Sequence, residues 1–325
     1  MDVSAFLSLP ATAPQRHIAI LAGPVQSAAT PPQPSQPYPG ATLVRAVDVT
    51  EIADAMLIGL RTAPAVLAVL GDGPFARHVI SVMLALQSAD VSIPPLLLLS
   101  PQRESAAALS LATAGPVMPI LETVTGRIER ASLATITSAL SPLAIDVPGE
   151  PRQVGLIFGA GAYAYGLHGN FHGLFNPLDL LRLHLWRRLV RPKGVAAIAA
   201  STAQRKAELC RVTVDKHPAL SKYLYGALIS SLPLPLLRDK HIGDNTPLGF
   251  LGVERTHKAR RAALRSFRGR LDRSTFEHGV HLTRGQTMSM RLSGPYSLDG
   301  DKVKSSGTLS VSATPPLDMI DLRAV

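Results

Sequence analysis

A short turn, Gly71-Asp72-Gly73, contains the residue types that hold phosphate groups in many proteins. Glycine lets the backbone approach a ligand closely, and the free N–H groups at the start of a following helix face its negative charge. The Asp72 carboxylate can bind a metal ion or, through water, a phosphate. Gly71, Asp72 and Gly73 are therefore candidates for a nucleotide site. The alternative is an ordinary turn between a strand and a helix.

A second acidic turn, Leu298-Asp299-Gly300-Asp301, lies between two predicted strands near the C-terminus. Taken alone, an Asp-Gly turn of this kind predicts a hairpin tip with both carboxylates accessible. A carboxylate aligned on a hydroxyl group can accept its proton during phosphoryl transfer. For the two turns to serve one reaction, Asp72 and Asp299 would have to meet in a cleft between domains.

The first turn has the neighbours that such a site needs. The apolar run 65–70 predicts a buried strand, and the apolar residues at steps of three and four over 74–86 predict an amphipathic helix. Pro74 suits the first position of that helix, where a missing N–H costs nothing. The remaining elements predicted nearby are strands at 17–22, 41–47 and 96–99 and helices at 51–61 (with Thr50 as its N-cap), 105–112 and 130–140. This alternation predicts a doubly wound, mostly parallel α/β sheet.

The pattern of the chain changes near residue 145, and strands dominate from there on. We therefore predict an α/β domain over 1–145 and a mainly antiparallel β-sandwich over 146–325. The elements predicted in this second domain are strands at 153–158, 195–199, 209–214, 223–230, 248–253, 287–292 and 308–312 and helices at 178–190 and 257–268.

The net charge of +10 predicts an anionic partner. Two clusters carry much of it: Arg182, Arg187, Arg188, Arg191 and Lys193, and then Arg255, Lys258, Arg260, Arg261, Arg265, Arg268, Arg270 and Arg273. Aromatic residues make up only 5% of the chain and no nucleic-acid motif accompanies the clusters, which argues against nucleic acid. An anionic membrane surface fits better, since each base near it adds about 1 kcal/mol. The alternative is a set of solvated helix faces.

Several features of the sequence bear on the cellular location of the protein. No apolar run approaches the roughly 20 residues that cross a bilayer. The first basic residue is Arg16, which argues against a secretory signal. The single cysteine, Cys210, excludes an internal disulfide and is typical of a reducing compartment. We expect a cytoplasmic protein that docks on the inner face of a membrane; pairing with a second copy as a homodimer is left open.

Taken together, the strand–turn–helix at 65–86, the β-rich second half and the late Asp299-Gly300-Asp301 resemble the diacylglycerol kinase-like lipid kinases, a family that includes sphingosine kinases and bacterial lipid kinases. The order of these features matches over nearly the whole chain. The resemblance implies a kinase that uses ATP and Mg²⁺ to phosphorylate a hydroxyl of a diacylglycerol- or sphingoid-type lipid. It further implies that the domain over 1–145 binds the nucleotide through the Gly71-Asp72-Gly73 turn and that the domain over 146–325 binds the lipid substrate. It also implies Asp299 as the base that deprotonates the lipid hydroxyl and Asp301 as a ligand of the metal.

The chain departs from that family at several motifs. The family's Gly-Gly-Asp-Gly-Thr is Leu70-Gly71-Asp72-Gly73-Pro74 here, and its second phosphate loop keeps only a proline, Pro101. The loss of backbone donors and a hydroxyl predicts weaker phosphate binding. A catalytically inactive pseudokinase that binds a nucleotide or lipid is therefore the alternative. A third possibility is a kinase of a soluble substrate, such as an NAD kinase, which the basic clusters and the late acidic turn make less favoured.

Overall fold

The chain folds into two compact units, Met1–Leu140 with Pro315–Val325, and Ser141–Thr314. The predicted division after residue 145 lies near the first boundary. The prediction had two continuous domains, whereas the C-terminal segment returns to the first unit. The expected strand 195–199, helix 178–190 and nearly all of helix 257–268 lie outside the described residues. The computed structural model describes residues 15–23, 41–46, 48, 50–71, 73–100, 106–161, 163–164, 208–215, 217–232, 246–254, 256, 258–259, 277–292, 294–303 and 307–324.

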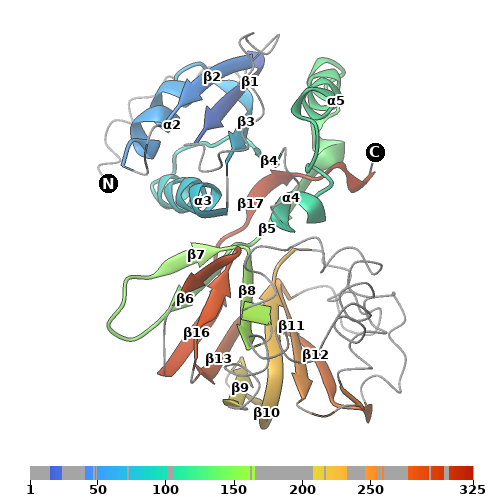
Figure 1. Ribbon diagram of the computed structural model, residues 1–325. Coiled ribbons are helices and arrows are strands. Elements are labelled where there is room, and N and C mark those ends of the chain that lie inside the picture. Colours follow the sequence, from blue (N-terminus) through green and yellow to red (C-terminus); the bar gives the residue numbers. More distant parts are fainter. Residues whose placement is uncertain are drawn as a thin grey trace, which may run out of the picture. The chain divides into compact units, whose positions relative to one another are not determined.

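The sheet of the first unit is parallel except for one edge strand (Figure 1). Its strands, in their order across the sheet, are β2 (Ala41–Arg45), β1 (Gln15–Ala22), β3 (Pro64–Leu70), β4 (Leu96–Leu99), β17 (Leu317–Ile320) and β5 (Thr137–Leu140). Only β5 runs antiparallel, against β17. Because β2 and β3 lie on opposite sides of β1, the strand order reverses between β1 and β3. This is the doubly wound arrangement that the sequence predicts.

The described helices of the first unit are α2 (Ile52–Leu60), α3 (Gly73–Ser88), α4 (Ala106–Ser110) and α5 (Val117–Glu129). The predicted apolar stripe of α3 is confirmed, since Val79, Ile80, Met83 and Leu86 are all buried. The parallel strands are apolar on both faces, as expected when helices cover a sheet on both sides. Within the described part of the chain, no helix is both long and apolar enough to cross a membrane.

The prediction of a helix at 130–140 is wrong. The helix is α5, which ends at Glu129; a 3₁₀ turn at Leu133–Ile136 and strand β5 follow it. Pro116 is the N-cap of α5 and Pro119 falls in its first turn, where a proline lacks no needed N–H. The buried stripe that forms this helix is Ile120, Leu121, Val124 and Ile128.

The prediction of Thr50 as an N-cap is also wrong. The N-cap position of α2 is Glu51, and no side chain caps the helix there. Instead, the backbone N–H of Thr50 and its Oγ1 hydroxyl donate to Asp48 Oδ1, at 2.7 and 2.5 Å. Asp48 therefore organises the entry into α2 through a turn of its own, and these bonds from Thr50 lower the pKa of its carboxyl.

The second unit is an antiparallel β domain, as predicted. Its strands are β6 (Leu143–Asp146), β7 (Gln153–Gly155), β8 (Ile157–Gly161), β9 (Glu208–Val214), β10 (His217–Ser230), β11 (Leu248–Glu254), β12 (Val280–Gly285), β13 (Thr287–Leu292), β14 (Tyr296–Leu298), β15 (Asp301–Val303) and β16 (Gly307–Ala313). The long β10 pairs with β9 along its first half and with β8 and β11 along its second. Alternate residues of these strands enclose one apolar core, in which the rings of Phe158 and Tyr296 lie 5.2 Å apart.

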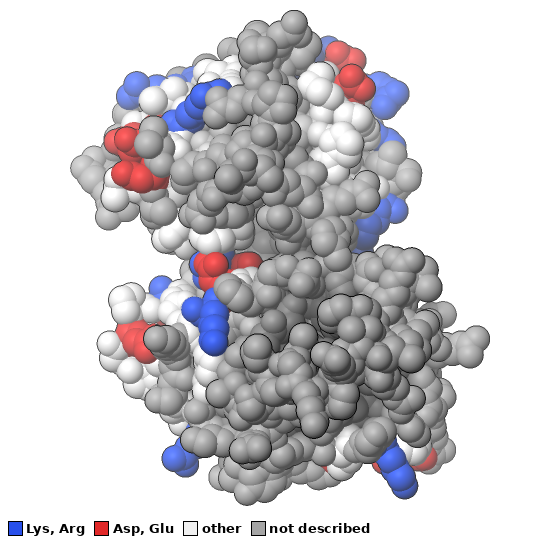
Figure 2. All heavy atoms as spheres, viewed as in Figure 1, with Lys and Arg blue, Asp and Glu red and all other residues white. Residues whose placement is uncertain are grey.

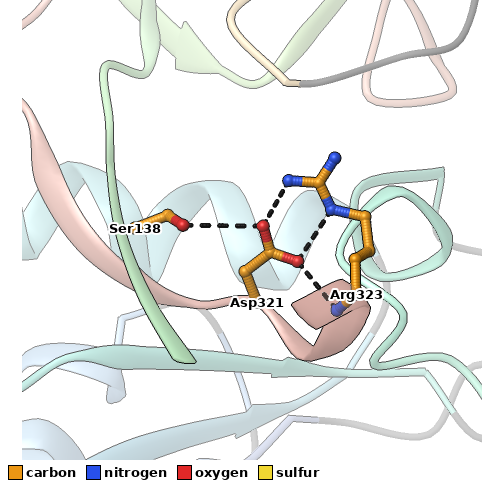
Figure 3. A network of polar contacts seen from close by, with 3 residues as sticks. All are labelled: Ser138, Asp321 and Arg323. Atoms are coloured by element: carbon orange, nitrogen blue, oxygen red, sulfur yellow. Dashed lines mark hydrogen bonds and ion pairs between the residues drawn. The ribbon is translucent and has the colours of Figure 1, made fainter. Parts of the chain in front are cut away.

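A polar network around Asp321 joins the C-terminal segment to the rest of the first unit (Figure 3). The Asp321 carboxylate accepts hydrogen bonds from Arg323 Nε at 2.7 Å and from Arg323 Nη2, and its backbone N–H donates to the Ile136 carbonyl. Burial acts most strongly on its pKa and raises it, but the bonds from Arg323, the charge of Arg323 and the bond from Ser138 together hold the pKa below its ordinary 3.8.

We predict that Asp321→Asn lowers the free energy of unfolding by about 1–3 kcal/mol at neutral pH, because it removes a charge-assisted pair from a largely buried position. Because the pKa in the folded chain lies below 3.8, this stabilisation is present above 3.8 and is lost as the pH falls through the folded value. Urea unfolding, followed by circular dichroism at several pH values, measures this difference in the free energy of unfolding. Asp318→Asn, at an exposed position of the preceding strand β17, is the control; equal losses in both variants would contradict this explanation.

Candidate functional site

The glycine turn lies where the strand order of the first sheet reverses. The N–H of Gly23, just after β1, donates to the carbonyl of Leu70 at the end of β3, at 2.9 Å. At such a reversal, the connections after the two strands leave in opposite directions and open a crevice in which α/β proteins bind ligands. Helix α3 begins at Gly73, so the N–H groups of its first turn lie at this same edge. Asp72 lies outside the described residues.

Phe75, in the first turn of α3, explains why two of the nearby residues are glycines. A Cβ on Gly23 would lie 2.6 Å from Phe75 Cγ, and a Cβ on Gly71 would lie 2.5 Å from Phe75 Cδ1. The buried Phe75 ring therefore packs directly on the backbone of both strand ends. Packing against Phe75 is thus a reason for glycine at both positions, and it was not predicted from the sequence. The sequence feature that could have indicated it is an aromatic residue two positions after the turn.

These residues fit a phosphate group at the strand ends. The Phe75 ring takes the side of Gly23 and Gly71 that faces α3, so a ligand would reach their backbone from the carboxyl edge of the sheet. Pro74 contributes no N–H, which leaves the N–H groups of Gly73 and of the residues after Pro74 as donors at the helix start. Binding of a nucleotide by Gly71, Asp72 and Gly73 stays a prediction.

The acidic turn belongs to the second unit and is a hairpin tip, as its sequence predicts. Leu298 of β14 pairs with Asp301 of β15, and Asp299 and Gly300 make the turn between them. Both turn residues have positive φ, +50° and +96°. Two positive φ angles match the right-handed twist of a two-residue hairpin, and Asp-Gly is among the sequences that adopt them most readily.

The Asp299 carboxylate is held by the backbone at the start of β8. Oδ1 accepts the N–H of Ile157 at 2.8 Å, and both carboxylate oxygens lie 3.0 Å from the N–H of Leu156. The N–H of Asp299 in turn donates to the Ile157 carbonyl. These bonds fix the orientation of the Asp299 carboxylate relative to the start of β8.

The same arrangement occurs a second time, at Asp215. This residue follows β9 with a φ of +48°, and its Oδ1 accepts the N–H groups of Gln286 and Thr287, at 2.9 and 2.8 Å, at the start of β13. Its N–H donates to the Thr287 carbonyl. Each aspartate also lies against a glycine that precedes its two N–H donors, Gly155 for Asp299 and Gly285 for Asp215. We call each set an aspartate clamp.

Asp301, the expected metal ligand, lies two residues after Asp299 on β15, an edge strand of the second sheet. It is half-buried, and its side chain has the hard oxygen donors that Mg²⁺ prefers. Among the described residues, no group of three or more His, Cys, Asp and Glu side chains could by itself hold a metal ion. The role of Asp301 at a metal, and the meeting of Asp72 with Asp299, stay predictions.

Solved diacylglycerol kinase structures share this fold. A diacylglycerol kinase from Bacillus anthracis is 10% identical, with a TM-score of 0.57 over 95% of this chain and 98% of its own. A putative diacylglycerol kinase from the same organism is 9% identical, with a TM-score of 0.56 over 95% and 97%. An NAD kinase from Archaeoglobus fulgidus in complex with ATP is 8% identical, with a TM-score of 0.47 over 94% and 95%. No protein-family model and no curated protein matches the sequence. The chain thus has the fold of the diacylglycerol kinase structures.

We predict that Gly71→Ala lowers the free energy of unfolding by about 1–3 kcal/mol, because its Cβ would overlap the Phe75 ring. Phe75→Leu should relieve this overlap, so the double variant should lose less than the two single variants added together. Urea unfolding of all four proteins gives the coupling energy. Strict additivity would contradict the packing explanation for Gly71.

Proposed function

We propose that this protein is an ATP- and Mg²⁺-dependent kinase that phosphorylates a hydroxyl group of a diacylglycerol- or sphingoid-type lipid. The observation that carries the proposal is the glycine turn, at the strand-order reversal of a chain that shares its fold with diacylglycerol kinases over 95% of its length. The oriented Asp299 carboxylate on the second unit supports it further.

Each part of the reaction has a residue assigned to it. The N–H groups at Gly71, Gly73 and the first turn of α3 bind the phosphates, with Asp72 beside them. When bound, ATP supplies the phosphoryl group and Mg²⁺ offsets its negative charge. Asp299 accepts the proton of the lipid hydroxyl, and the Asp301 carboxylate is a ligand of the metal. General-base catalysis of this kind contributes about 10²–10⁴-fold to a rate.

We predict that Asp299→Asn lowers kcat for lipid phosphorylation by about 10²–10⁴-fold, because the amide cannot take the proton. Asparagine tolerates positive φ and keeps one oxygen for the clamp, so the fold should persist. Asp215→Asn makes the same change in the other clamp and should leave kcat within about twofold. The assay is transfer of labelled phosphate from ATP to diacylglycerol, sphingosine or NAD by the purified full chain.

Three outcomes would overturn the proposal in different ways. Transfer to none of these acceptors would point to the inactive pseudokinase that binds nucleotide or lipid. Transfer to NAD alone would assign a soluble substrate. Equal losses in the Asp299→Asn and Asp215→Asn variants would mean that Asp299 acts only through the fold.

We also propose that the protein works in the cytoplasm, docked on the inner face of an anionic membrane through its two arginine-rich clusters. The net charge of +10 supports this. Figure 2 draws the described Lys and Arg side chains of one face spread out, with Asp and Glu among them. Of the two clusters, only Lys258 falls within the described residues, so the docking proposal depends on the sequence.

We predict that the protein co-sediments with vesicles containing phosphatidylglycerol and not with vesicles of phosphatidylcholine alone, and that salt weakens this binding because it screens the charges. Replacing Arg260 and Arg261 by Glu should weaken binding more than replacing Arg45 and Arg61, two exposed arginines outside the clusters. Equal binding to neutral vesicles, or equal effects of the two charge reversals, would contradict the docking proposal.

A further inference from the structure

The chain has two described aspartate clamps, and only the one at Asp299 includes the proposed general base. In both clamps a hairpin-tip aspartate is bound by two consecutive backbone N–H groups of another strand. Both clamps contain the same backbone bonds between a hairpin tip and another strand, so the clamp has a structural role in each place. The Asp299 clamp differs in that its second oxygen also lies within hydrogen-bond distance of an N–H, that of Leu156. Both oxygens of this carboxylate are therefore fixed in space.

Gly155 controls how closely that carboxylate can approach the strand. A Cβ on Gly155 would lie 2.6 Å from Asp299 Oδ2 and 2.7 Å from Leu298 Cγ, with Leu298 Cδ1 closer still. Contacts this short do not occur, so a side chain at position 155 would force the side chains of Leu298 and Asp299 to shift, and the Asp299 carboxylate would move relative to the N–H groups of Leu156 and Ile157. Hydrogen bonds weaken steeply with distance and misalignment, so the carboxylate would lose its orientation.

We propose that Gly155 is a positioning residue for the reaction: its missing side chain lets the Leu156 and Ile157 N–H groups hold the Asp299 carboxylate in one orientation toward the lipid hydroxyl. This inference rests on the proposed function for its catalytic part. A misplacement of a reacting group by about 1 Å can cost about 10²-fold in rate. Gly155 touches neither phosphate nor lipid in this account, and it acts through Asp299.

The structure supplies a matched control at Gly285. A Cβ there would lie 2.9 Å from Asp215 Oδ2 and closer still to Val214 Cγ1, which mirrors the surroundings of Gly155. Gly155→Ala and Gly285→Ala therefore impose the same local overlap on two copies of one motif. Only the first copy includes the proposed base.

The experiment compares the purified full chain with the two variants in the lipid phosphorylation assay and in amide ¹H–¹⁵N spectra. We expect Gly155→Ala to lower kcat by about 10-fold or more with little change in KM for ATP, and to shift the resonances of Leu156 and Ile157. Gly285→Ala should shift those of Gln286 and Thr287 and leave kcat within about twofold. If Gly155→Ala does not fold, the double variant Gly155→Ala with Leu298→Ala removes the overlaps with Leu298 Cδ1 and Cγ and keeps the overlap with Asp299 Oδ2.

The two readouts separate failure of this inference from failure of the proposed function. Turnover in the wild type with unchanged kcat in Gly155→Ala would overturn the positioning role. Equal losses of kcat in both variants would reduce it to a general effect on stability. Absence of turnover in the wild type would overturn the proposed function, and the spectra would still decide whether Gly155 sets the orientation of Asp299; unshifted Leu156 and Ile157 resonances would overturn that as well.

Discussion

The central interaction of the second unit is the bond between a hairpin-tip carboxylate and two backbone N–H groups at the start of another strand. The first residues of a strand have N–H groups that need a partner, and a turn with positive φ brings an aspartate side chain to them. The chain uses this solution at Asp215 and again at Asp299. The contact joins each hairpin tip to another strand and fixes a charged group in a defined orientation.

Close approach to glycine is the common principle of both candidate sites. In the first unit, the Phe75 ring lies against Gly23 and Gly71, and in the second the tip around Asp299 lies against Gly155. In each case the glycine is where it is because a neighbouring side chain occupies the space of its Cβ. A glycine at such a position can be required by packing or by the close approach of a ligand, and only the structure distinguishes these two causes.

The sequence was a good guide at several places where the determining interactions are local. The apolar stripe of α3, the strand β3 and the hairpin tip at Asp299 depend on residues close together in the chain, and each was predicted. The sequence was a poor guide where partners are distant. Asp299 and Leu156 are 143 positions apart, so no local pattern indicates their bond. The return of β17 to the first sheet was missed for the same reason.

Some local predictions also failed, and their causes are specific. Asp48 took the role expected of Thr50 because its side chain accepts the backbone N–H groups two and three residues further on, those of Thr50 and Glu51. Helix α5 was missed because Gly115-Pro116 suggests a break, although Pro116 is the N-cap of the helix, where a proline is tolerated. The chemistry expected at Asp299 and Asp301 depends on residue type, which the sequence gives directly, and on orientation, which it does not.

Hydrogen exchange at individual N–H groups tests the clamp at Asp299 most directly. Asp299→Gly removes the carboxylate and keeps positive φ accessible, so the backbone turn should survive. The account predicts that the N–H groups of Leu156 and Ile157 exchange slowly in the wild type and much faster in this variant, while those of Gln286 and Thr287 keep their protection. Rapid exchange at Leu156 and Ile157 in the wild type, or unchanged protection in the variant, would contradict it.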